Sequence, residues 1–164
     1  MKIFVMNGQG GTGKTTFQNL IAQYCDGAVA QISMVSYVKT VAAAIGWDGS
    51  KEPRDRKMLS QLKDLLTEYN DSPFQSTVGA VKQMKEDGVT CCFIDAREPN
   101  DIDRLKEALD CQTVLVIRGE QKSYGNHADD NVFNYQYDIV IDNNGSFEDL
   151  KDCAQTFVEE FINE

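Results

Sequence analysis

A run of eight residues near the start of the chain limits the possible folds more than any other feature. Residues 8–15 match the pattern G-x-x-x-x-G-K-[S/T] and lie between a short apolar stretch and an amphipathic one. Glycines let the backbone curl tightly, so that successive N–H groups can point at phosphate oxygens, and a following helix adds its positive dipole end. A strand, this loop and a helix in that order predict a phosphate-binding loop.

The same pattern predicts roles for individual residues. Lys14 is expected to contact the β- and γ-phosphates of a nucleotide, the hydroxyl of Thr15 to ligate Mg²⁺, and Thr16 to touch the α-phosphate. The alternative is a glycine-rich turn that binds nothing, but the flanking strand and helix favour the phosphate loop. The residues expected to bind the nucleotide are Gly8, Gly10, Gly11, Thr12, Gly13, Lys14, Thr15 and Thr16.

Apolar spacing along the chain predicts alternating strands and helices. Alternation of this kind favours a parallel sheet covered by helices, which is an α/β fold, and ligands of such sheets bind outside the carboxyl ends of the strands. Ser146, followed by Asp149 three residues later, is expected to cap the last helix. Strands are predicted at 2–6, 28–32, 89–94, 113–117 and 137–141, and helices over 14–25, 34–45, 54–69, about 70–86, after Pro99 and after Ser146.

Composition limits the possible partners. The chain has 164 residues, which fits one domain over 1–164, and 16 basic against 26 acidic residues give a net charge of −10. This balance argues against a nucleic-acid polymer or an anionic membrane as partner, but it leaves room for a small phosphorylated ligand. No apolar run approaches the roughly 20 residues that span a bilayer. Five cysteines without C-x-x-C spacing favour reduced thiols, no disulfides and a cytoplasmic location.

Two charged residues follow the most strand-like segment. Asp95 ends this apolar run, the position of a carboxylate that holds Mg²⁺ near Thr15; the alternative is that it caps the next helix. Arg97 lies two residues on and should face the same side of an extended chain. Its guanidinium can grip a phosphate, or it can form a structural ion pair with Glu98 or a helix carboxylate. Arg104 is expected to pair at the surface with Asp101 or Glu107.

Taken together, these segments resemble the nucleoside and deoxynucleoside monophosphate kinases, in particular the small adenylate-kinase-like enzymes of phages and bacteria. The resemblance rests on the N-terminal phosphate loop, the Asp-x-Arg-x-Pro stretch at 95–99, the polar segment after the fourth strand and the turn at 142–146. It implies a three-layer P-loop NTPase fold with a five-stranded parallel sheet in the order 2-3-1-4-5 and helices on both faces. It also implies an acceptor-binding helical region at 33–74 and a lid segment at 119–131.

The resemblance also implies a site and an activity. ATP and Mg²⁺ are the expected cofactors, and the expected reaction is phosphoryl transfer to a small phosphorylated acceptor, most simply a nucleoside or deoxynucleoside monophosphate. A non-nucleotide acceptor (dephospho-coenzyme A, phosphomevalonate or shikimate) and a catalytically silent nucleotide-binding protein stay open. For Arg54 and Arg56 the alternative is a solvated helix face. The implied catalytic residues are Lys14, Arg97, Arg118 and Lys122, and the implied acceptor-binding residues are Ser33, Ser36, Lys39, Arg54, Arg56 and Arg97.

Overall fold

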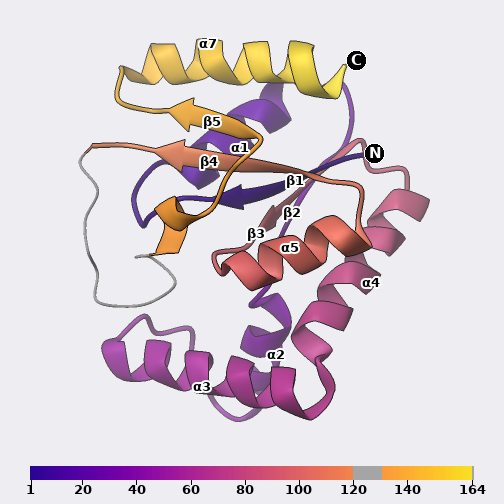
Figure 1. Ribbon diagram of the computed structural model, residues 1–164, viewed down its shortest axis with the longest axis vertical. Helices are drawn as coiled ribbons and strands as arrows, with labels where there is room; N and C mark the ends of the chain where they lie inside the picture. Colours follow the sequence, from indigo (N-terminus) through magenta and orange to yellow (C-terminus); the bar gives the residue numbers. More distant parts are fainter. Residues whose placement is uncertain (120–130, 164) are drawn as a thin grey trace.

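The computed structural model describes residues 1–119 and 131–163 (Figure 1). The strands are β1 (Lys2–Asn7), β2 (Val29–Ser33), β3 (Cys91–Asp95), β4 (Gln112–Ile117) and β5 (Ile139–Asp142). The helices are α1 (Lys14–Tyr24), α2 (Ser36–Ala44), α3 (Pro53–Asn70), α4 (Ser72–Glu86), α5 (Pro99–Ala108) and α7 (Phe147–Phe157). A 3₁₀ turn, η1 (Asn131–Asn134), precedes β5, and a π-helical stretch, η2 (Val158–Ile162), continues α7.

The five strands form one sheet in the order β2-β3-β1-β4-β5, and every neighbouring pair is parallel. This confirms the predicted α/β fold and strand order. In Figure 1 the arrowheads of β1, β4 and β5 point the same way, so their carboxyl ends meet at one edge, from which the phosphate loop leads into α1.

Side chains that alternate along the strands divide the core into two layers, because successive residues of a strand face opposite sides of the sheet. One layer holds Phe4, Met6 and Phe93 against α1 and α7, and the other holds Val5 and Ile94 against α4 and α5. The adjacent thiols of Cys91 and Cys92 follow this rule and lie in different layers, as expected of core thiols. All five cysteines are free thiols.

The last helix begins as the sequence predicts. The Ser146 hydroxyl accepts a hydrogen bond from the Asp149 amide (3.2 Å), and the Asp149 carboxylate accepts one from the Ser146 amide (2.7 Å), which makes a capping box.

The edge strand β5 begins two residues later than expected. Asp138 lies inside the predicted strand, but its carboxylate accepts hydrogen bonds from the Thr113 amide and hydroxyl (both 2.8 Å). A side chain therefore takes the place of ladder pairing at this point, and the strand starts at Ile139.

Helical spacing in the predicted segment 54–69 places Leu65 and Tyr69 on one apolar side. In α3 they are 61% and 81% exposed, because α3 packs on α2 and α4 rather than on the sheet. Arg104, on α5, was expected to pair with Asp101 or Glu107; their charges help to raise its pKa, but in the described part of the chain its hydrogen bonds and ion pair go to another carboxylate. Its guanidinium binds the Asp71 carboxylate between α3 and α4, and it lies over the ring of Phe74, 3.9 Å from the centroid.

In the described part of the chain, no helix combines the length and the apolar character that crossing a membrane requires.

Candidate functional site

The phosphate loop connects β1 to α1 through three glycines with positive φ, at positions 8, 11 and 13. Two of them also meet close neighbours. A Cβ on Gly8 would lie 2.4 Å from the carbonyl oxygen of Val116 on β4, and a Cβ on Gly13 would lie 2.4 Å from the side-chain nitrogen of Asn143. Around Gly10 and Gly11, by contrast, an added Cβ would meet nothing within 4 Å. The loop is therefore held tightly at its two ends and is open to an approaching ligand at its middle.

Lys14 is the first residue of α1, and its side chain folds back over the loop. Its Nζ donates hydrogen bonds to the carbonyls of Gly8 (2.6 Å) and Gln9 (3.0 Å). The ammonium group is thus kept beside the loop, at the amino end of a helix whose dipole is also positive there. Thr15 and Thr16 follow in the first turn of α1 and are exposed.

Asp95 ends β3 beside the phosphate loop, because β3 is the neighbour of β1. Its Oδ1 accepts a hydrogen bond from the amide of Gln18 (2.9 Å), a residue of α1 that is 1% exposed. Gln18 lies one turn after Thr15, so the two residues share a side of α1. In the described structure Asp95 makes no cap for α5, whose N-cap residue is Glu98.

Three basic residues that the sequence analysis assigned to the site affect the pKa of the Asp95 carboxyl group. Burial raises the pKa of Asp95, while the hydrogen bond from Gln18 and the charges of Lys14, Arg97 and Lys39 work in the opposite direction. The structure therefore places the loop lysine, the arginine after β3 and the lysine of α2 within electrostatic range of one carboxylate. The sequence alone could not show this arrangement, because these residues are spread over more than 80 positions.

Ser33 and Ser36 shape the turn between β2 and α2. The Ser36 hydroxyl accepts a hydrogen bond from the Ser33 amide (3.1 Å), and the Ser33 hydroxyl accepts one from the Val35 amide (3.4 Å). Ser33 is the register partner of Asp95 in the sheet, so this turn lies next to the carboxylate. The two hydrogen bonds also explain why α2 begins at Ser36, two residues later than expected.

A small cavity of about 190 Å³ lies on the other side of the loop, toward β4 and β5. Its lining joins loop residues Gln9 and Thr12 to Arg118, which directly follows β4, and to apolar side chains. Those apolar side chains are Leu115, Ile117, Phe133 and Val140.

Other expected site residues lie elsewhere. Arg54 and Arg56 are exposed in the first turn of α3, and the Arg56 Nε donates to the carbonyl of Lys51 (2.8 Å). Their distance from the sheet follows from the packing of α3 on α2 and α4 (Figure 1). Lys122, and most of the predicted lid at 119–131, lie outside the described residues.

Three buried polar residues hold the site together and were missed by sequence reasoning. Gln18 orients Asp95, and Asn143 donates from its Nδ2 to the carbonyl of Thr12 (2.9 Å), which ties the end of β5 to the loop. Asn7 contacts three separate segments from the end of β1. For Gln18 the sequence signal is a polar residue between the apolar Phe17 and Leu20 in a predicted helix.

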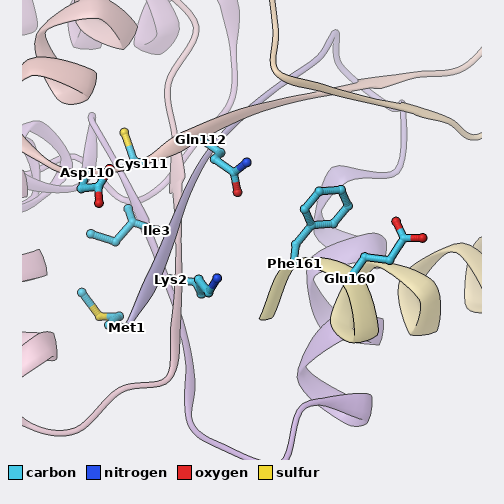
Figure 2. A pocket seen from close by; sticks show the side chains of 8 residues that line it. All are labelled: Met1, Lys2, Ile3, Asp110, Cys111, Gln112, Glu160 and Phe161. Carbon is cyan, nitrogen blue, oxygen red and sulfur yellow. The ribbon is translucent and has the colours of Figure 1, made fainter. Parts of the chain in front are cut away.

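A larger cavity of about 680 Å³ lies at the opposite edge of the sheet, at the amino ends of β1 and β4 (Figure 2). Figure 2 shows Lys2 and Ile3 on opposite sides of β1, with Asp110 and Phe161 well apart. Ligands of parallel α/β sheets bind at the carboxyl ends of the strands, so size alone does not make this hollow the functional site.

Across residues 1–119 and 131–163, no three His, Cys, Asp or Glu side chains group in a way that could hold a metal ion. Mg²⁺ is normally bound through one or two protein oxygens together with phosphates and water. Thr15 and Asp95 are the pair that could supply those oxygens.

No protein-family model matches the chain, and no curated protein sequence matches it either.

Solved structures do resemble it along almost its whole length. A sugar kinase from Janibacter sp. HTCC2649 is 17% identical with a TM-score of 0.57, covering 99% of this chain and 96% of that one. The shikimate kinase of Aquifex aeolicus is 11% identical with a TM-score of 0.51, covering 97% and 96%. A putative kinase of Chloroflexus aurantiacus is 10% identical, also with a TM-score of 0.51, covering 96% and 94%.

None of these three is described as a nucleoside monophosphate kinase, so that part of the resemblance stays a prediction. At such low identity the likeness concerns the fold alone. The chain has the three-layer fold of the P-loop kinases, with a five-stranded parallel sheet in the order 2-3-1-4-5.

Proposed function

We propose that the chain is a phosphotransferase that moves the γ-phosphoryl group of ATP to a small phosphorylated acceptor. The observation that carries this proposal is that Lys14, Arg97 and Lys39 lie near enough to Asp95, beside the phosphate loop, for their charges to act on its pKa. On a chain with a net charge of −10, such a local concentration of positive charge favours phosphate binding at this place over the rest of the surface.

The donor side is built on the loop. The open backbone at Gly10 and Gly11 and the first turn of α1 would receive the β- and γ-phosphates, and Lys14 would exchange its two carbonyl partners for phosphate oxygens. Thr15 and Asp95 would hold Mg²⁺, which supplies charge neutralisation on the phosphoryl group when bound.

The small cavity beside Thr12 supports a place for the adenine base. Its lining is largely apolar, as base-binding pockets are, and it opens next to the loop that would hold the phosphates. Arg118 lines the same cavity and would contribute positive charge on the donor side. Lys122 stays a candidate for the same role within the proposed lid, 119–131.

The acceptor side is assigned to the opposite flank of the loop. Arg97 and Lys39 would orient the acceptor phosphate, and Ser33 and Ser36 lie at the neighbouring turn. The acceptor is a nucleoside or deoxynucleoside monophosphate in this proposal, with 33–74 as the acceptor-binding region. Arg54 and Arg56 stay candidates for more remote contacts from α3.

A second acceptor class has support of its own. The fold is shared with proteins described as a sugar kinase and a shikimate kinase, so a non-nucleotide acceptor such as dephospho-coenzyme A, phosphomevalonate or shikimate is kept as the alternative.

A coupled assay of ADP release tests both classes. The purified chain is incubated with ATP and Mg²⁺ together with each nucleoside and deoxynucleoside monophosphate in turn, and then with the three non-nucleotide acceptors. Rapid ADP release with one monophosphate is the expected result. Release with a non-nucleotide acceptor would select the alternative, and slow hydrolysis of ATP with every acceptor would refute the kinase proposal and favour a silent nucleotide-binding protein.

A further inference from the structure

Asn7, the last residue of β1, bonds the first residue of the phosphate loop, which directly follows it, and two segments that are distant in the sequence. It is 1% exposed. Its Oδ1 accepts a hydrogen bond from the amide of Gly8, the first residue of the phosphate loop (2.8 Å). Its Nδ2 donates to the backbone carbonyl of Arg97 (3.2 Å) and to the hydroxyl oxygen of Tyr137 (2.7 Å).

These contacts use both donors of the side chain and one of the two lone pairs of its oxygen. An amide has two N–H donors and one carbonyl oxygen, and each N–H of Asn7 has its own acceptor while the oxygen has a donor. Flipping the amide would set the Asn7 oxygen against the Arg97 carbonyl and its NH₂ group against the Gly8 amide. One orientation therefore satisfies all three segments, which fixes them relative to one another.

Tyr137 extends the connection by one step. Its hydroxyl accepts from Asn7 and donates to the carbonyl of Val132 in η1 (2.8 Å), and Val132 is fully buried. Burial raises the pKa of Tyr137 to about 12, so the hydroxyl keeps its proton, and its role as a donor, at neutral pH. The ring is held against Tyr135 with centroids 5.1 Å apart. Tyr137 is thus a fixed support for the Asn7 amide.

We infer that Asn7 is a positioning residue that sets the spacing between the phosphate loop and Arg97, with Tyr137 holding its amide in place. In the proposed phosphotransferase, on which this role in catalysis depends, Gly8 belongs to the donor side and Arg97 to the acceptor side. Asn7 lies between them without reaching either substrate. Such a residue acts through geometry, and displacing a reacting group by about 1 Å can reduce turnover about a hundredfold.

The most direct test of this inference removes only the hydroxyl group of Tyr137. Tyr137→Phe keeps the ring and deletes both hydrogen bonds of the hydroxyl, while Tyr135→Phe removes a neighbouring hydroxyl whose partner is Asp103 (2.7 Å) and serves as the matched control. Tyr137→Phe is expected to lower kcat/KM for the acceptor about tenfold and to change the KM for ATP less than about twofold. Tyr135→Phe is expected to leave both constants near those of the wild type.

A double-mutant cycle separates positioning from a general loss of stability. Asn7→Leu removes all three contacts and is expected to reduce kcat/KM for the acceptor strongly, but to have much less effect in an Arg97→Ala background, because its influence on the acceptor passes through Arg97. Two results would overturn the inference. One is a double variant whose loss in kcat/KM equals the product of the losses caused by Asn7→Leu and Arg97→Ala separately. The other is a Tyr137→Phe variant with wild-type kinetics.

Hydrogen exchange keeps the inference testable whether or not an acceptor is found. In the apo protein, Asn7→Leu should speed amide exchange together in peptides covering 8–13, 95–100 and 131–138, and Tyr137→Phe should do so mainly in the last two. Unchanged exchange in 95–100 would refute the structural coupling. A wild-type chain that transfers no phosphoryl group would instead refute the proposed function while leaving this coupling measurable.

Discussion

Gln18 donates a hydrogen bond of 2.9 Å to Oδ1 of Asp95, and this contact joins the helix that follows the phosphate loop to the end of β3. Gln18 is 1% exposed, so its amide is committed to this bond. One oxygen of Asp95 is therefore held in place, and Thr15 lies one turn before Gln18 on the same helix. The arrangement orients the proposed metal carboxylate before any ligand arrives.

Asp95→Asn is expected to stabilise the apo protein and to abolish phosphoryl transfer. Burial raises the pKa of Asp95, so the fold disfavours its charged form. Below the ordinary carboxyl pKa, Asp95 is protonated in both the folded and the unfolded chain, and variant and wild type should differ least. As pH rises through the folded-state pKa, the wild type loses stability that the variant keeps. Thermal unfolding from mildly acidic to neutral pH measures the gap, and a gap that shrinks with rising pH would contradict the prediction.

Gln18→Leu is expected to impair the use of Mg²⁺ more than the binding of nucleotide. The substitution leaves the half-buried Asp95 carboxylate without this hydrogen-bond donor, which costs about 1–3 kcal/mol in stability and releases the orientation of Asp95. The KM for Mg²⁺ should rise while the affinity for a fluorescent ATP analogue in EDTA stays close to that of the wild type. An unchanged Mg²⁺ dependence would separate Gln18 from metal binding.

Lys14→Ala is expected to reduce kcat by about a hundredfold to a thousandfold, the usual loss when one group that stabilises transition-state charge is removed. The fold should persist, because the hydrogen bonds from the Lys14 ammonium to the carbonyls of Gly8 and Gln9 lie within the loop and not in either layer of the core. Circular dichroism and the coupled ADP assay provide the two measurements. Lys151→Ala, which removes a half-buried lysine paired with Glu148 on α7, is the control and should retain activity.

Arg97→Ala is expected to raise the KM for the acceptor at least about tenfold and the KM for ATP much less, since a bidentate guanidinium–phosphate contact would be lost on the acceptor side alone. Lys39→Ala should shift the constants in the same direction. Steady-state kinetics, with ATP and the acceptor varied in turn, shows whether Arg97 acts on the donor side or on the acceptor side. Equal changes in both constants would move Arg97 to the donor side.

Gly13→Ala and Gly10→Ala form a matched pair in the loop. At Gly13 a methyl group would need a backbone φ of 93° and would lie 2.4 Å from Asn143, so this variant should lose at least about 1–2 kcal/mol of stability and bind ATP weakly. At Gly10 the methyl group meets nothing within 4 Å, and stability should stay near that of the wild type. Urea unfolding of the two variants, followed by titration with a fluorescent ATP analogue, checks the contrast. Similar stability losses at the two positions would show that the clash with Asn143 is unimportant.

Much of the fold could be predicted because it depends on local patterns. Three such patterns are the glycine-rich run at 8–15, the alternation of apolar segments and the Ser146–Asp149 cap. The structure has the expected loop between β1 and α1, the alternating strands and helices, and the capping box of α7. The exposure of Leu65 and Tyr69 could not be predicted in this way. Spacing shows that they share a side of α3, but whether anything covers that side depends on where the helix docks.

The sequence by itself determined the phosphate loop, the α/β class and the residues that follow each strand, because backbone conformation and hydrophobic periodicity are local properties. Only the tertiary structure decided that Lys14, Lys39 and Arg97 lie within electrostatic range of Asp95, that Gln18 and Asn7 hold this site, and that Arg54 and Arg56 lie on a helix set away from the sheet. The physical reason is that parallel strands far apart in the chain end at one edge, and hydrogen bonds between those ends depend on packing that no single segment encodes.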